Sequence, residues 1–240
     1  MIPIGDNNKD RIRTPYINIA LIILNIIVYA YFQGFGNNEG FTASFATIPA
    51  EILTGVDVVY KGNIGVTPIP VHLTIITAMF MHGGFLHLAG NMLYLWVFGD
   101  NLENVMGHFK YLMFYLLTGI IATLCHVFAT QLLDANIYVP SLGASGAISG
   151  ILGGYLLMFP KNEVRVLFFM IIIRVPAFIT LGLWIGMQLW EGWGSIGQKA
   201  EGGVAYAAHI GGFIAGLLLV KFFASKRKVQ GQKFQFLRDS

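Results

Sequence analysis

The chain has 240 residues, of which 55% are hydrophobic and only 11% carry a charge. A soluble domain has about 25% charged residues, so this composition excludes an ordinary soluble protein and is typical of one that crosses a membrane several times. The net charge is +3, but the basic residues gather at the two ends of the chain, which favours a membrane surface over nucleic acid as their partner.

Six apolar segments follow one another along the chain, each close to the roughly 20 residues that a spanning helix needs. The fifth contains Arg174 and Pro176, which predict a kinked helix or an interfacial turn followed by a shorter helix. The long segment 34–81 is rich in Ile and Val and contains several prolines, so we expect it to be structured on the membrane surface. The predicted spanning helices lie near 16–33, 82–99, 110–131, 143–160, 167–190 and 204–223.

The distribution of Lys and Arg predicts how these helices are oriented. Basic residues precede the first span, follow the last and occupy the second and fourth loops, whereas the other loops have few. Because positive loops tend to stay inside, both termini are expected to be cytoplasmic. The predicted fold is therefore an all-α membrane protein, a six-transmembrane-helix bundle. Its parts are a cytoplasmic N-terminal tail, 1–13, a membrane domain, 14–224, and a basic cytoplasmic C-terminal tail, 225–240.

Four polar side chains lie near the beginning of three of the spans. Placing a polar side chain in hydrocarbon costs free energy, so these residues indicate a functional role. His87 and Asn91 belong to the second span, Ser145 to the fourth and His209 to the sixth. All three spans run inward from the outer face in the predicted orientation. With a rise of 1.5 Å per residue, each side chain lies within about 5 to 14 Å of the outer end of its helix. The pattern predicts that they meet at one depth.

Small residues at a spacing of four let two of these helices approach closely. If the fourth and sixth spans pack together, Ser145 comes within about 2.6 to 3.2 Å of His209, as general-base activation of a serine requires. Ser145 also lies in the first turn of its helix, where free N–H groups favour an oxyanion, and His87 and Asn91 add donors. The small residues are Gly146, Gly150 and Gly154 in one helix and Ala208, Gly212 and Gly216 in the other.

Two alternatives remain when the residues are taken singly. A serine in a membrane helix often bonds a carbonyl one turn back, which applies to Ser145 and also to Ser149, about 6 Å deeper. We interpret Ser149 as a packing residue. The histidines and Glu103 suggest a metal site, but Glu103 is expected about 25 Å from His87 and the His-Glu-x-x-His pattern of zinc proteases is missing. We therefore expect neither a metal nor a cofactor.

At these positions the chain resembles the rhomboid family of intramembrane serine proteases. The resemblance extends over most of the membrane domain, with the residues in family order and at family spacing. Glu103 and Gly107, just past the second span, also fit the family pattern. The matching residues are His82, His87 and Asn91, then Gly143, Ser145 and Gly146, and finally Ala208, His209, Gly212 and Gly216.

The resemblance implies a Ser-His dyad in which Ser145 is the nucleophile and His209 is the general base and later the acid. It also implies an oxyanion hole formed by Asn91, His87 and the amide of Ser145. The implied partners are transmembrane protein substrates, cleaved near the outer face of the lipid bilayer, and the sequence leaves the oligomeric state open. Structural roles near the site fall to His82, Gly143 and Gly146.

The chain departs from the family pattern at Ser149, where some members carry a tyrosine that packs on the catalytic histidine. We expect Tyr206 or an aromatic residue of the second span to hold the His209 ring instead. The fifth helix and the loop 191–203 form the expected substrate gate. The expected location is the plasma (inner) membrane of a prokaryote, with the active site on the extracellular or periplasmic side. A rival hypothesis is a catalytically silent relative that binds membrane helices for retention or quality control.

Overall fold

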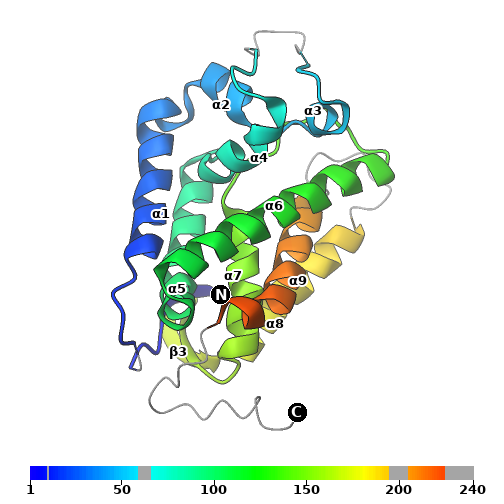
Figure 1. The fold of residues 1–240 in the computed structure, drawn as a ribbon. Helices are drawn as coiled ribbons and strands as arrows, with labels where there is room; N and C mark the ends of the chain where they lie inside the picture. Colours follow the sequence, from blue (N-terminus) through cyan, green and yellow to red (C-terminus); the bar gives the residue numbers. More distant parts are fainter. Residues whose placement is uncertain (10, 59–65, 195–204, 225–240) are drawn as a thin grey trace.

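The computed structural model describes residues 1–9, 11–58, 66–194 and 205–224. The predicted C-terminal tail and most of the predicted gate loop lie outside the described residues. The rest is mainly helical, and α7 packs against α5, α6 and α9 (Figure 1). The strands and main helices are β1 (Ile2–Asp6), α1 (Tyr16–Ile27), α2 (Glu39–Phe45), α3 (Pro49–Thr54), α4 (Thr74–Thr77), α5 (Phe85–Met106), α6 (His108–Leu132), α7 (Ser145–Met158), β2 (Glu163–Phe168), β3 (Ile171–Pro176), α8 (Ala177–Gly194) and α9 (Ala205–Phe223).

Four of the predicted helices form within a few residues of their expected bounds, as α1 with the helical turn that follows it, α6, α7 and α9. α5 differs, because it continues to Met106 instead of ending near residue 99. Its last turns contain Asp100, Asn101 and Glu103, which favour a loop when only their polarity is considered. All three are buried and bonded to the N-terminal segment, so the helix continues until Gly107, at φ 81°, ends it.

The N-terminal segment is fixed to the end of α5 by these bonds. The carboxylate of Glu103 accepts hydrogen bonds from the backbone N–H groups of Ile17 at 3.0 Å and Asn18 at 2.7 Å. These N–H groups belong to the first turn of α1 and have no partner within the helix. Arg11 bonds Asp100 at 3.0 Å. The polar end of α5 therefore positions α1 beside it.

The prediction of a helix over 167–190 is wrong for its first ten residues. The strands β2 and β3 form an antiparallel hairpin there, and β1 pairs antiparallel with β2 to give a three-stranded sheet of order β1-β2-β3. β-branched residues suit the pleated surface, and Val164 and Val166 are fully buried on its inner face. The chain is thus mainly helical, but the sheet corrects the all-α prediction.

Among the described residues, α6 and the stretch Tyr206–Phe223 of α9 are long and apolar enough to cross a membrane. A third span results if the helical stretch Val71–Phe80 and α5, bent by 79° at their break, count as one. The stretch Tyr16–Phe32 and α7 are apolar but shorter. Six spanning helices and their orientation therefore remain a prediction.

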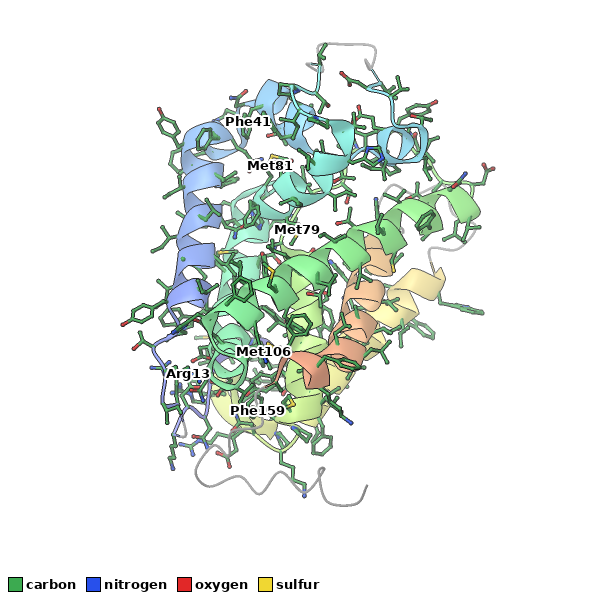
Figure 2. All side chains as sticks on the ribbon, in the orientation of Figure 1. Arg13, Phe41, Met79, Met81, Met106 and Phe159 are labelled. Carbon is green, nitrogen blue, oxygen red and sulfur yellow. The ribbon has the colours of Figure 1, made fainter. Side chains whose placement is uncertain are left out.

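The two ends of the long helices are covered by different parts of the chain. The segment 34–81, expected to be structured, forms α2, α3 and α4 in its described part and covers one end, whereas β3 lies at the other (Figure 1). Figure 2 shows Phe41 and Met81 at the first end and Arg13 and Phe159 at the second. Ser145 begins α7 beneath the first end.

Candidate active site

The loop that leads into α7 is tied to the segment that covers it. Thr47 and Ser141 exchange two backbone hydrogen bonds, of 3.0 and 2.7 Å. Two residues later, the N–H group of Gly143 donates to the carbonyl of Ala78 at 2.9 Å. Because both sides of this loop are bonded, the position of Ser145, the first residue of α7, is fixed.

The helices α7 and α9 touch through their backbones. A Cβ on Gly212 would collide with the carbonyl oxygen of Gly146, and one on Gly216 would collide with that of Gly150. The two helices therefore meet at Gly146 and Gly150, as predicted, whereas a Cβ on Gly154 would contact Phe114, Leu102 and Val220. Such close approach needs glycine on the facing side, since any side chain would separate the helices.

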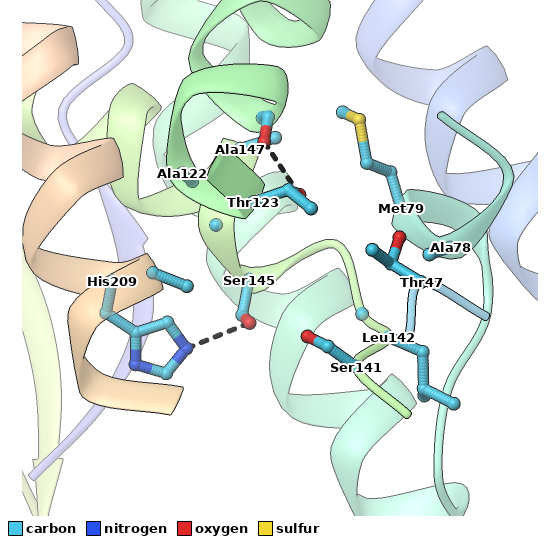
Figure 3. A pocket seen from close by; sticks show the side chains of 14 residues that line it. Thr47, Ala78, Met79, Ala122, Thr123, Ser141, Leu142, Ser145, Ala147 and His209 are labelled. Carbon is cyan, nitrogen blue, oxygen red and sulfur yellow. Dashed lines mark hydrogen bonds between the residues drawn. The ribbon is translucent and has the colours of Figure 1, made fainter. Parts of the chain in front are cut away.

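This packing brings the Ser145 hydroxyl to the imidazole of His209 (Figure 3). The distance from Ser145 Oγ to His209 Nε2 is 2.9 Å, although 64 residues separate them in the chain. Both residues are partly buried. Ser149, one turn further along α7, donates its hydroxyl hydrogen bond to the carbonyl of Ser145 at 2.7 Å, which agrees with its interpretation as a packing residue.

The other side of the His209 ring is held by α8. Its Nδ1 lies 2.6 Å from Oε1 of Gln188, and its ring centroid lies 6.1 Å from that of Trp184, at an interplanar angle of 41°. These two residues of α8 take the place predicted for Tyr206 or an aromatic residue of the second span. Trp184 and Gln188 are four residues apart, on one face of α8. That spacing is the signal in the sequence that could have revealed them.

His87 and Ser145 both lie close to Gly143. A Cβ at Gly143 would be 3.0 Å from His87 Nε2 and 3.7 Å from Ser145 Oγ, and the residue has a φ of 128°. Asn91, one turn after His87 on α5, is 8% exposed, and its Nδ2 has no hydrogen-bond partner within the described part of the chain. A buried donor without a partner is destabilising, so its presence indicates another use.

His82 lies behind His87, with ring centroids 5.2 Å apart in an edge-to-face arrangement. Its backbone, rather than its ring, forms hydrogen bonds with Gln33 at the end of the first helix. The N–H group donates to Gln33 Oε1 at 2.9 Å, and the carbonyl accepts from Gln33 Nε2 at 3.0 Å. Gln33 Nε2 also donates to Thr42 Oγ1 at 3.0 Å. The chain before α5 is thereby fixed to the end of the first helix and to α2.

A small cavity of about 50 Å³ opens beside Ser145 and His209. Thr47, Thr123 and Ser141 contribute polar side chains to its lining (Figure 3). A cavity needs a volume of at least about 10 to 15 Å³ and several polar partners to hold a water molecule. The cavity therefore has room for water next to a serine that is hydrogen-bonded to an imidazole, and with the imidazole neutral this arrangement is suited to nucleophilic catalysis.

Comparison with known proteins agrees with this geometry. A family model described as the Rhomboid domain matches residues 71–226. Rhomboid protein 1, mitochondrial, of Saccharomyces cerevisiae is 33% identical over 162 residues, which cover 67% of this chain and 44% of the yeast protein. RHOMBOID-like protein 4 of Arabidopsis thaliana is 31% identical over 176 residues, covering 72% of this chain and 38% of that protein. The human Presenilin-associated rhomboid-like protein, mitochondrial, is 26% identical over 151 residues, which cover 60% of this chain and 36% of the human protein.

The chain spans less than half the length of these curated relatives. Two of the three are mitochondrial by name, and this contradicts the expected location in the plasma membrane of a prokaryote. The family model covers the helices that carry His87, Ser145 and His209. The chain belongs to the rhomboid family.

Proposed function

We propose that the chain is an intramembrane serine endopeptidase that hydrolyses peptide bonds in or near transmembrane segments of other membrane proteins. The observation that carries the proposal is the 2.9 Å hydrogen bond between Ser145 Oγ and His209 Nε2, beside a cavity with polar and apolar side chains in its lining. Membership of the rhomboid family supports it. The rival hypothesis of a silent helix-binding protein has no comparable support, because both members of the dyad are in place.

In the first half of the reaction, Ser145 Oγ attacks the carbonyl carbon of the substrate and its proton passes to His209 Nε2. The tetrahedral intermediate collapses when the C–N bond breaks, and the same proton moves from His209 to the leaving amine. The product is an ester between the acyl part of the substrate and Ser145. In the second half, water from the cavity attacks the ester, His209 accepts its proton, and that proton returns to Ser145.

The negative charge of the tetrahedral intermediate falls on the oxygen of the attacked carbonyl. The N–H group of Ser145 lies in the first turn of α7, where N–H groups lack helical partners. Asn91 Nδ2 is a buried donor without a hydrogen bond in the described structure, so it can bond the oxyanion without first breaking another bond. We assign the oxyanion hole to these two donors, with His87 beside Gly143 as the third.

The proposal includes the predicted topology of six spanning helices with both termini on the side rich in Lys and Arg. In Figure 1, α1 begins and α9 ends toward the same end of the molecule, which supports this arrangement. Ser145 then lies toward the opposite face of the bilayer. A substrate helix must unwind there, because a helical backbone keeps its carbonyls in internal hydrogen bonds.

A fluorophosphonate probe tests the proposed nucleophile directly, because it reacts covalently only with an activated serine. The purified protein in detergent is expected to gain one probe at Ser145, located by mass spectrometry of its peptides. Ser145→Ala and His209→Asn should abolish labelling, whereas Ser149→Ala should preserve it. An unlabelled parent that still binds a transmembrane peptide would support the silent relative instead.

A further inference from the structure

Most of α8 is exposed, even though it borders the active site. Only Ala177 and Leu181, near its beginning, are buried. Beyond them, Trp184 packs on α9, with its ring 6.1 Å from that of His209 and 6.0 Å from that of Phe213. Gln188 follows one turn later and bonds His209. Trp184 and Gln188 thus attach the half of α8 next to the dyad to α9, together with Gly192, which lies against Tyr206.

The contact with Gln188 favours one position of the proton on the His209 ring. The amide oxygen Oε1 of Gln188 lies 2.6 Å from Nδ1 and only accepts hydrogen bonds, so this contact stabilises the neutral tautomer with its proton on Nδ1. The lone pair of Nε2 then faces the hydroxyl of Ser145, 2.9 Å away. A general base needs this tautomer, because the opposite one would present an N–H group to the serine.

We propose that Gln188 is a positioning residue that holds His209 in the reactive tautomer, so that the position of α8 controls the base. In Ser-His-Asp triads a carboxylate on the far side of the imidazole has this task. Here a neutral amide from a weakly buried helix takes its place. When α8 moves outward, Nδ1 loses its acceptor and the ring is free to turn or to change tautomer. Hydrolysis then requires α8 to return, which couples closure of the site around a substrate to catalysis.

The proposal rests on the proposed function and is tested by two variants of matched length. Gln188→Met removes the acceptor, and kcat for a single-span substrate should fall about tenfold, equivalent to about 1.4 kcal/mol, with little change in KM. Gln188→Glu retains an acceptor at the same place and should retain most of kcat. Equal loss in both variants, or a change confined to KM, would contradict a positioning role.

A second readout does not depend on activity. The ¹⁵N NMR signals of the His209 ring, assigned by their loss in His209→Asn, should show the proton on Nδ1 in the parent and a mixture of tautomers in Gln188→Met. If cleavage depends on Ser145 but Gln188→Met matches the parent in kcat and in tautomer, Gln188 has no positioning role and the proposed function stands. If cleavage persists in Ser145→Ala, the proposed function itself is wrong.

An independent observation concerns one end of the three-stranded sheet. Ile2 pairs with Leu167, so the beginning of β1 lies beside the turn that joins β2 and β3. The large side chains there face outward, and Phe169 is 84% and Met170 93% exposed. An apolar group of this kind on a protein surface marks an interaction site. It comprises Ile2, Phe168, Phe169, Met170, Ile171 and Ile172.

The sheet is anchored behind this end and carries positive charge there. Val164 and Val166 are fully buried against the helices, so only the last residues of the hairpin project. Arg165 and Arg174 face each other across the two strands, three residues behind Phe168, which is about 10 Å at 3.3 Å per residue. Glu163 pairs with Arg174 at 3.5 Å, and Arg165 lies near the carboxyl of Asp6, whose pKa burial raises to about 7, so the two arginines leave only a small positive charge here.

We infer that this end of the sheet inserts into the interface of a bilayer that contains anionic lipid. Amphipathic segments bury their apolar part about 5 to 10 Å into the boundary between headgroups and acyl chains, and their basic residues stay among the headgroups. The distance between the apolar tip and the two arginines fits this depth. The hairpin also joins α7 to α8, both of them apolar helices of the same membrane domain.

Quenching of a fluorophore by brominated lipids tests the inference. Cys125→Ser removes the one cysteine, and a dye is then attached through Met170→Cys or, as a control before β2, through Lys161→Cys. In liposomes, quenching should be strong at 170, weak at 161, and greater at 170 with phosphatidylglycerol than with phosphatidylcholine alone. Equal and weak quenching at both positions would overturn the inference, as would disulfide crosslinking between copies at position 170.

Discussion

Gly212 of α9 lies with its α-carbon against the carbonyl oxygen of Gly146 in α7, and this contact determines how closely His209 approaches Ser145. A Cβ at position 212 would overlap that oxygen, so the two helices can adopt this separation only with glycine there. The distance between Ser145 Oγ and His209 Nε2 is therefore determined by the backbone packing of two helices rather than by a loop.

Gly212→Ala should push α9 away from α7 and lengthen the 2.9 Å bond between Ser145 and His209. Overpacking of this kind costs about 1 to 3 kcal/mol, so both the melting temperature and the cleavage rate should fall. Gly182→Ala is the matched control, because a Cβ at position 182 on α8 would meet nothing within 4 Å. Parent-like cleavage by Gly212→Ala would show that the helix contact does not determine the catalytic distance.

Asn91→Leu separates catalysis from stability. The substitution removes a proposed oxyanion donor, and kcat should fall about 100-fold with little change in KM. Asn91 Nδ2 has no partner in the described structure, so the variant should be as stable as the parent or more stable. Steady-state kinetics and thermal unfolding in the same detergent measure both effects. A large loss of stability would mean that Asn91 is structural.

Gly143→Ala should disturb the entrance to the active site. The residue has a φ of 128°, which is unfavourable for alanine, and the added Cβ would stand 3.0 Å from the ring of His87. Strain of this kind costs about 1 to 3 kcal/mol. Cleavage should fall at least tenfold while the protein remains folded. Gly90→Ala on α5, where a Cβ meets nothing within 4 Å, should cleave like the parent.

The N-terminal strand should make stability depend on pH. Burial raises the pKa of the Asp6 carboxyl to about 7, and the charge of Asp100 adds to the shift, whereas hydrogen bonds from Tyr155 and Asn101 and the charge of Arg165 oppose it. The unfolded chain loses this proton near pH 4, so the folded state binds more protons between about pH 4 and 7. Stability should therefore fall as pH rises through this window and level off above it.

Asp6→Asn should remove that decline, which amounts to a few kcal/mol at about 1.4 kcal/mol per pKa unit. Thermal unfolding at pH 4.5, 6 and 7.5 measures the change. Asp134→Asn, which alters an exposed residue in a turn, should leave the decline of the parent intact. A parent whose melting temperature rises between pH 4.5 and 7.5 would contradict the assignment to Asp6.

The pairing of Ser145 with His209 could be predicted because small residues at a spacing of four indicate which helix faces pack together. Local pattern was sufficient there, since Gly212 and Gly216 each pack against a glycine of α7, in a recognisable helix. The end of α5 could not be predicted in this way. Asp100 and Glu103 look like loop residues until the N-terminal segment, some 90 positions away, supplies their partners.

The sheet could not be predicted for a related reason. A short apolar run is compatible with a strand or a helix, and Arg174 and Pro176 leave open whether the helix begins before or after them. A single glutamine in an apolar helix is a weak signal until its partner, His209, is known from the fold.

Cleavage of a single-span substrate in proteoliposomes, compared between the parent, Ser145→Ala and Ser149→Ala, tests the central claim most directly. We predict that the parent and Ser149→Ala cleave the substrate and that Ser145→Ala does not. Cleavage by Ser145→Ala at the rate of the parent would contradict the account, because the hydroxyl bonded to His209 would then not be the nucleophile.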